Sequence, residues 1–185
     1  MNKYIPTYLA QTVYDIDFVT LYEQGKRVIL FDLDNTLASY EEAIPTEKQL
    51  ELNKYLRKLG YKIYIVSNNR EPRTKLYTTT FVVDNYLVLA RKPFTRRITK
   101  FLKKENINKN GMIMIGDQLL TDICCANKLG VDCYLVHSIS RKTEKWYTKI
   151  NRKREKIVLR KIEKKNEKLA NEIRKIIGNQ GDHYE

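Results

Sequence analysis

The chain has few of the residues from which disulfide frameworks, zinc sites and membrane spans are built. Its three cysteines, Cys124, Cys125 and Cys133, are an adjacent pair and one odd thiol, with neither disulfide-scaffold numbers nor metal-ligand spacing. We expect buried thiols in a reducing compartment. No run of 18 apolar residues occurs and the amino terminus lacks a small-residue cleavage site, which predicts a cytoplasmic protein without a transmembrane span.

Positive charge is concentrated in one segment. The chain of 185 residues carries a net charge of +13, and residues 141–175 alone hold 15 basic and 5 acidic side chains. We therefore divide the chain into a body, residues 1–140, and a basic amphipathic helical tail, residues 141–185. A chain of this length buries roughly 70% of its unfolded surface, which is enough for one core.

Apolar runs that alternate with amphipathic segments predict an α/β fold with a parallel sheet flanked by helices. Strands are expected at about 27–32, 62–66, 112–115 and 133–136, with a further short strand from 81–83 and 86–89. Helices are expected at about 17–24, 46–59, 70–80, 95–105 and 121–129.

Polar side chains follow these strands where they end. Asp32 and Asp34 come after the first apolar run, Ser67 after the second, and Asp117 after 112–115. Open α/β sheets bind ligands at this carboxyl edge. Each of these polar segments, taken alone, would more often be a turn or a helix cap. Their order along the chain instead indicates a magnesium-dependent phosphoryl-transfer site.

Three segments resemble the haloacid dehalogenase-like (HAD) phosphatases. The segment Asp32-Leu33-Asp34-Asn35-Thr36 has the Asp-x-Asp-x-Thr pattern of their first motif. The Ala-Arg-Lys-Pro at 90–93 and the Ile-Gly-Asp-Gln-Leu-Leu-Thr-Asp at 115–122 are similar to the YqeG family of capless, subclass IIIA members. The resemblance runs from about residue 14 to residue 152, and it implies a HAD-like Rossmannoid sheet.

The resemblance also implies the catalytic roles. Asp32 is expected to be the nucleophile that forms an aspartyl-phosphate, and Asp34 the general acid and base. Mg²⁺ is expected to bind Asp32, Asp117 and the main-chain carbonyl of Asp34, since it needs only one or two protein carboxylates.

The remaining matched residues are expected to support these groups. Ser67, Asn68 and Lys92 are assigned to the substrate phosphate, whose oxygens carry negative charge. Thr36 is expected within reach of the nucleophile, although it more simply shapes the loop. Asp122 either caps the following helix or holds a metal-bound water. Neither His137 nor His183 is needed by this chemistry.

Short spacings leave no room for an inserted cap domain. About 29 residues separate the first motif from Ser67, and about 24 separate Ser67 from Lys92. The site should therefore open to solvent or to a bulky partner. Because YqeG relatives include mitochondrial phosphatidylglycerophosphatases, the resemblance implies phosphatidylglycerophosphate as substrate; a phosphoprotein, a nucleic-acid end or a sugar phosphate would fit an open site equally.

The tail has its own set of alternatives. Its apolar residues have helical spacing: Ile150, Ile157, Ile162, Leu169, Ile173 and Ile176. This helix either packs on the body or stays solvated, or it binds an anionic membrane surface or RNA phosphates. Trp146-Tyr147 favours a membrane interface, on the inner face of the membrane, and no recognised nucleic-acid motif supports RNA.

A second class of function is a non-catalytic basic protein associated with RNA or the ribosome. Such a scaffold would have no physical need of Asp32, Asp34, Lys92 and Asp117 together. The sequence therefore favours an enzyme.

Overall fold

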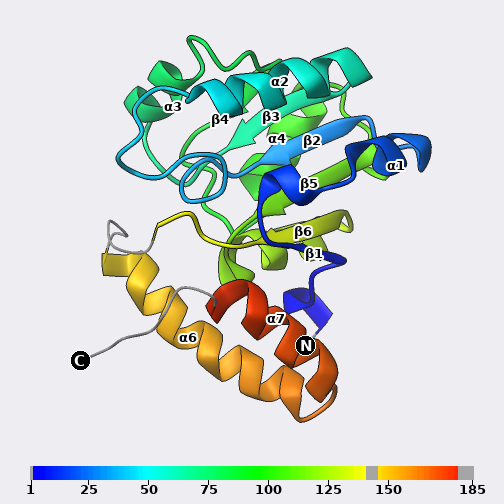
Figure 1. Cartoon of the computed structure of the whole chain (residues 1–185), viewed down its shortest axis with the longest axis vertical. Coiled ribbons are helices and arrows are strands. Elements are labelled where there is room, and N and C mark those ends of the chain that lie inside the picture. Colours follow the sequence, from blue (N-terminus) through cyan, green and yellow to red (C-terminus); the bar gives the residue numbers. More distant parts are fainter. Residues whose placement is uncertain (1, 141–145, 179–185) are drawn as a thin grey trace.

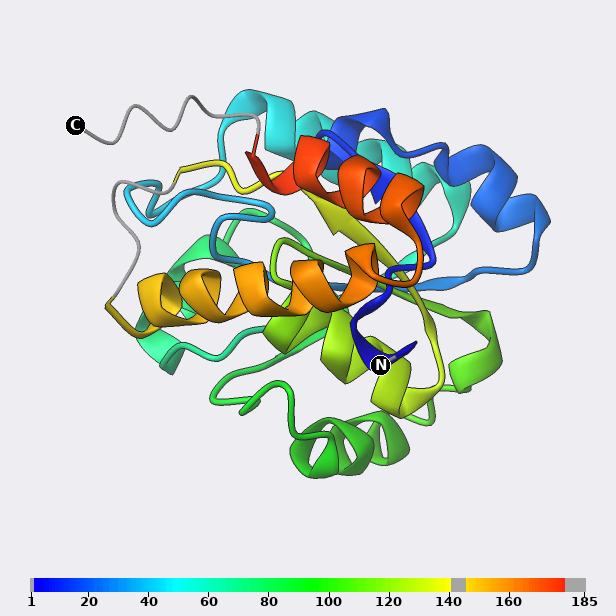
Figure 2. The ribbon, with the colours of Figure 1, turned by 90° about the horizontal axis from the view of Figure 1, so that it is seen from below.

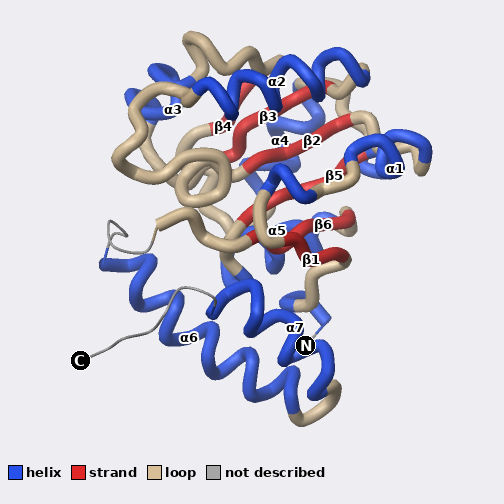
Figure 3. Tube along the Cα trace, viewed as in Figure 1, coloured by secondary structure: helices blue, strands red, loops and turns tan. Residues whose placement is uncertain are grey.

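Six parallel strands form one sheet in the order β1-β6-β5-β2-β3-β4 (Figure 1). The computed structural model describes residues 2–140 and 146–178. Figure 3 shows the strands side by side, with helices on either side of them. The strands are β1 (Tyr8–Ala10), β2 (Val28–Phe31), β3 (Lys62–Val66), β4 (Asn85–Leu87), β5 (Met112–Gly116) and β6 (Asp132–Val136).

Helices cover both faces of the sheet because its strands are apolar on both sides. Ile29 and Phe31 of β2 pack with the layer of α1, α2 and α3, whereas Val28 and Leu30 pack with α4 and α5. The helices are α1 (Phe18–Glu23), α2 (Glu47–Leu59), α3 (Glu71–Tyr77), α4 (Arg96–Lys104), α5 (Cys124–Leu129), α6 (Trp146–Glu163) and α7 (Glu167–Gly178). A π-helical turn, η4 (Leu119–Ile123), directly precedes α5. Single-turn 3₁₀ helices are η1 (Asn2–Tyr4), η2 (Val13–Asp15) and η3 (Lys109–Gly111).

The α/β fold class is confirmed, and two predicted strand features are corrected. The sequence did not predict β1, a strand of three residues that pairs with β6 at the sheet edge. The strand expected over 81–83 and 86–89 is limited to Asn85–Leu87, and Phe81 is buried outside any strand. The predicted buried, unbonded state of the three cysteines is confirmed.

The tail forms two helices, so the expectation of one basic helix is wrong. A break at 164–166 separates α6 from α7, and Asn166 caps α7 by accepting a hydrogen bond from the Leu169 N–H at 3.0 Å. Arg174 of α7 pairs with Glu163 of α6 at 2.6 Å. The two helices form a hairpin that lies across the β1 and β6 end of the sheet (Figure 2).

The inner side of this hairpin belongs to the core. Val158, Leu159 and Ile162 of α6, with Ile173 and the rest of the buried side of α7, share one apolar cluster with β5 and β6. The stripe read from the sequence is therefore only partly buried, because Ile150 and Ile157 remain exposed. The boundary between body and tail at residue 140 stays a prediction.

Two sequence predictions concern residues that the structure does not describe. The side chains of Trp146 and Tyr147 and all of His183 lie outside the described set. Within the described ranges, no helix is both long and apolar enough to cross a bilayer.

Truncating a buried tail residue should destabilise the whole fold. Ile173 is 0% exposed, so we expect Ile173→Ala to lower the free energy of unfolding by about 2–5 kcal/mol. Ile157→Ala is the matched control, because Ile157 is 53% exposed and its truncation should change stability by less than about 0.5 kcal/mol. Urea denaturation of both variants measures this, and an unchanged midpoint for Ile173→Ala would contradict the packing of α7 on the sheet.

Candidate active site

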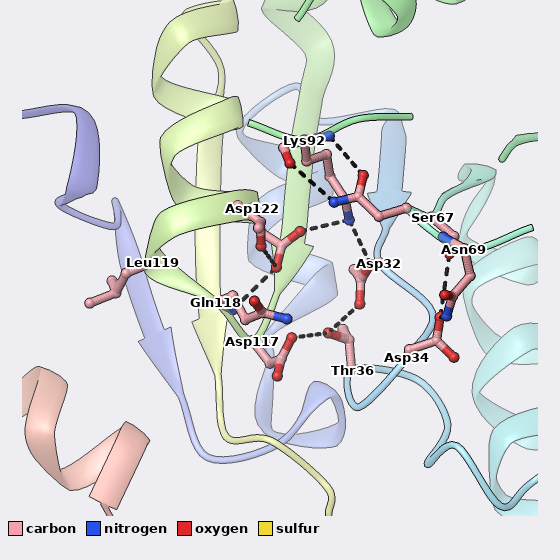
Figure 4. Close-up of polar contacts among 12 residues, drawn as sticks. Asp32, Asp34, Thr36, Ser67, Asn69, Lys92, Asp117, Gln118, Leu119 and Asp122 are labelled. Atoms are coloured by element: carbon pink, nitrogen blue, oxygen red, sulfur yellow. Dashed lines mark hydrogen bonds and ion pairs between the residues drawn. The ribbon is translucent and has the colours of Figure 1, made fainter. Parts of the chain in front are cut away.

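Three carboxylates meet at the carboxyl ends of β2 and β5 (Figure 4). Asp32 directly follows β2, Asp117 directly follows β5, and Asp122 lies in η4. The pairing of β2 with β5 continues through a hydrogen bond from the Asp32 N–H to the Ile115 carbonyl at 2.9 Å, which brings the two strand ends together. One oxygen of each carboxylate lies within 4.8 Å of the others, and all three residues are buried.

Lys92 supplies positive charge to this cluster. Its Nζ lies 2.5 Å from Asp32 Oδ1 and 2.7 Å from Asp122 Oδ1. Burial by itself would lower the pKa of Lys92, but the carboxylates of Asp122 and Asp32 outweigh it and raise that pKa above its ordinary value. The lysine therefore stays charged inside the protein.

The Asn68 side chain fixes the backbone that carries Lys92. It accepts a hydrogen bond from the Lys92 N–H at 2.7 Å and donates one to the Lys92 carbonyl at 3.1 Å. These contacts tie the loop after β3 to the loop after β4. The assignment of Asn68 to substrate phosphate stays a prediction.

The cluster holds more negative charge than Lys92 alone can balance. Burial raises the pKa of Asp32, Lys92 opposes this rise, and the carboxylates of Asp122 and Asp117 add to it. Because its donors are all oxygens, this acidic group suits Mg²⁺. A bound cation would stabilise the ionised form of Asp32.

Thr36 and Gly116 shape the cluster. Thr36 Oγ1 lies 3.3 Å from Asp32 Oδ2 and 3.5 Å from Asp117 Oδ1, so it bridges the two strand ends. A Cβ at Gly116 would come within 2.4 Å of the Asp122 Cβ. Only glycine lets η4 approach β5 this closely, and this approach brings Asp122 into the group.

Asp34 faces a different set of partners. Its Oδ2 accepts hydrogen bonds from Asn69 Nδ2 at 2.6 Å and Ser67 Oγ at 3.3 Å, and its Oδ1 pairs with Arg73 Nε. Arg73 also donates to main-chain carbonyls of the loop after β2, among them that of Glu42 at 2.9 Å. The fold therefore gives the two acids of the Asp-x-Asp motif separate environments.

Helix α6 reaches the cluster from the tail. Arg152 pairs with the Asp117 carboxylate and donates to the Asp117 carbonyl at 2.8 Å. Glu155 is buried and accepts a hydrogen bond from the Leu119 N–H at 2.6 Å. Both residues lie outside the strand-end motifs.

The acidic group was predicted from the sequence, whereas several of the residues that hold it and Asp34 in place were not. The structure brings together Asp32, Thr36, Lys92, Asp117 and Asp122, all of them predicted. It places the predicted Asp34 and Ser67 beside them in a second polar group. The residues not assigned from the sequence are Asn69, Arg73, Arg152 and Glu155.

A sequence signal for Glu155 was available. It lies on the same helical stripe as Val158, Leu159 and Ile162, and a carboxylate within an apolar stripe indicates a buried acid with a partner. Arg152, three residues earlier, is such a partner. Arg73 had no comparable local signal.

Comparison with known proteins places the chain in a family. Residues 1–140 match the family model described as "Mitochondrial PGP phosphatase". The chain is 29% identical over 162 residues to "Probable phosphatase YqeG" of Bacillus subtilis, an alignment that covers 88% of this chain and 93% of that protein.

Solved structures support the fold. A protein from Bacteroides fragilis described as "Putative haloacid dehalogenase-like hydrolase" superposes with a TM-score of 0.54 at 15% identity, over 64% of this chain and 91% of that one. An uncharacterized protein from Listeria monocytogenes gives a TM-score of 0.52 at 17% identity, over 64% and 85% of the two chains. The family model matches most of the chain, and the chain therefore belongs to the mitochondrial PGP phosphatase family.

Proposed function

We propose that the protein is a magnesium-dependent phosphomonoester hydrolase that forms a covalent aspartyl-phosphate on Asp32. The observation that carries this proposal is the buried group of Asp32, Asp117 and Asp122 with Lys92 between two of its members. Carboxylates this close repel one another, and a bound cation would offset that repulsion. If the role of this group were purely structural, apolar side chains would give equal or greater stability, because burying charged side chains is unfavourable.

In the first step an oxygen of Asp32 attacks phosphorus. A bond forms between them, the bond to the ester oxygen breaks, and Asp34 gives that leaving oxygen its proton. Lys92 offers fixed positive charge to the equatorial oxygens of the phosphoryl group. Ser67, next to Asp34 at 3.3 Å, would hold the same oxygens.

In the second step water attacks the aspartyl-phosphate. Asp34 takes a proton from this water, inorganic phosphate leaves, and the Asp32 carboxylate is restored. Separate surroundings suit this division of work, because Asp32 is held by Lys92 and Thr36, whereas Asp34 is held by Asn69 and Arg73.

The residues present fit a magnesium ion. Asp32 and Asp117 would hold it together with the Asp34 main-chain carbonyl, and Asp122 lies close enough to join them directly or through water. When bound, Mg²⁺ would reduce the repulsion between the anionic nucleophile and the anionic phosphoryl group.

We further propose phosphatidylglycerophosphate as the substrate. Support comes from the description of the matched family. It also comes from the outer side of α6, where the exposed residues include Lys153, Lys156 and Arg160. An anionic lipid surface would be attracted to such a helix. The same basic side chains would also attract RNA phosphates, so the description of the matched family is what favours the lipid over RNA.

Removing the nucleophile should abolish turnover. Asp32→Asn keeps the shape of the side chain but removes its charge, so we expect phosphatase activity to fall by at least about 10³-fold while the fold persists. Asp132→Asn is the matched control, because Asp132 lies at the amino end of β6, the end opposite the site. Mass spectrometry of acid-quenched enzyme should find a phosphoryl group on Asp32, and turnover by folded Asp32→Asn would refute the covalent mechanism.

Activity should require Mg²⁺ and respond poorly to Ca²⁺. Calcium takes 6–8 ligands at longer distances, so it would misplace the nucleophile. Mg²⁺ at 100 times its Kd should also raise the free energy of unfolding by about 2.7 kcal/mol, measured by thermal denaturation. Full activity after exhaustive chelation would exclude the metal site.

Membrane binding should depend on the outer side of α6. We expect the protein to co-sediment with anionic vesicles but not with neutral ones. Neutralising Lys153, Lys156 and Arg160 to Gln should weaken that binding about 100-fold, because each basic residue contributes about 1 kcal/mol.

The matched control neutralises three exposed lysines outside the tail, Lys54 and Lys58 of α2 and Lys62 at the start of β3. This triple variant should keep nearly full binding, although it loses the same charge. Equal loss in both triple variants would contradict a specific docking helix. Inactivity of the intact enzyme on phosphatidylglycerophosphate in vesicles would defeat the substrate proposal alone.

A further inference from the structure

Helix α6 contacts the segment after β5 that carries Asp117. The guanidinium of Arg152 contacts Asp117 twice, pairing with Oδ2 through Nη2 and donating from Nη1 to the main-chain carbonyl at 2.8 Å. Arg152 Nη1 also lies 3.2 Å from Glu155 Oε2. Its side chain is only 11% exposed. One planar fork therefore holds both the backbone and the carboxylate of Asp117.

Glu155 holds the next residues of the same segment. Its Oε1 accepts hydrogen bonds from the Leu119 N–H at 2.6 Å and the Leu120 N–H at 3.4 Å. These are the first two residues of η4, and the opening N–H groups of a helix have no partner inside it. Glu155 thus caps this π-helical turn from another helix.

Packing alone would not place an acid at this position. Glu155 is 1% exposed, and its neighbours on the inner side of α6 are Val158, Leu159 and Ile162. Burying a carboxylate is unfavourable unless it is paired and hydrogen-bonded. Glu155 is paired with Arg152 and hydrogen-bonded to the η4 backbone. Its role is therefore to hold the segment after β5 in place.

The two oxygens of Asp117 are thereby given different directions. Oδ2 is held by Arg152, and Oδ1 lies 3.5 Å from Thr36 Oγ1, on the side of Asp32. A carboxylate that was not held could rotate and present either oxygen. The contact with Arg152 leaves Oδ1 as the oxygen that faces the rest of the acidic group.

We propose that Arg152 and Glu155 are positioning residues, which hold Asp117 and η4 in the geometry that metal binding requires. The tail is then part of the active site. Both residues lie beyond residues 1–140, which match the family model, but within the longer alignment with YqeG. This inference rests on the proposed magnesium-dependent function. It assigns no direct contact with substrate to either residue.

Metal affinity separates positioning from simple charge balance. If Arg152 only offset negative charge, Arg152→Gln would leave a more negative site and Mg²⁺ would bind more tightly. If Arg152 orients Asp117, the same variant should bind Mg²⁺ about 10- to 100-fold more weakly. The two roles therefore predict opposite signs.

Titration calorimetry with MgCl₂ on the full chain measures this affinity, and steady-state kinetics on an aryl phosphate measures activity. We expect weaker Mg²⁺ binding by Arg152→Gln, with partial recovery in Arg152→Lys, which keeps the charge but loses the fork. Saturating Mg²⁺ should restore part of kcat. Arg152→Lys also provides the measurement if Arg152→Gln does not fold.

Arg174→Gln is the matched control. It breaks the buttressing pair with Glu163 inside the same hairpin but lies away from Asp117. We expect its Mg²⁺ affinity to stay within twofold of wild type. Unchanged or tighter Mg²⁺ binding by both Arg152 variants, or an equal loss in Arg174→Gln, would overturn the inference. Failure of the wild-type protein to bind Mg²⁺ or to hydrolyse the aryl phosphate would instead overturn the proposed function.

Discussion

Repulsion among buried carboxylates is the constraint on which the rest of the structure depends. Two unit charges 4 Å apart repel by about 4 kcal/mol at an effective dielectric constant of 20. Here one carboxylate oxygen from each of Asp32, Asp117 and Asp122 lies within 4.8 Å of the other two. Cations from two separate elements offset this repulsion: Lys92 from the loop after β4 and Arg152 from α6.

The same constraint explains the division of the Asp-x-Asp motif. A fourth carboxylate in the group would add further repulsion, and the chain turns Asp34 away toward Ser67, Asn69 and Arg73. Arg73 serves a second purpose, because it also holds carbonyls of the loop after β2. Charge balance and loop positioning are thus carried out by the same side chains.

Much of the fold and the acidic group of the site could be predicted from the sequence, because their signals are local. Apolar runs marked β2, β3, β5 and β6, and acids at strand ends marked the site. The three-residue β1 is too short for a pattern, and the break before α7 has no glycine or proline. The signal available at this break was Asn166, a residue type that favours helix N-caps and that accepts a hydrogen bond from the Leu169 N–H. The pairs of Arg152 with Asp117 and of Arg73 with Asp34 join segments 35 and 39 residues apart, which no periodicity reveals.

The contact between α6 and Asp117 also bears on how the protein matures. Ribosomes deliver Asp32 early and Arg152 late, so a nascent chain that ends near residue 140 already has every carboxylate of the acidic group. It does not yet have the guanidinium that holds Asp117, nor the hairpin that covers the β1 and β6 edge. During synthesis, therefore, the strand-end residues of the acidic group would be present before Arg152 could hold Asp117.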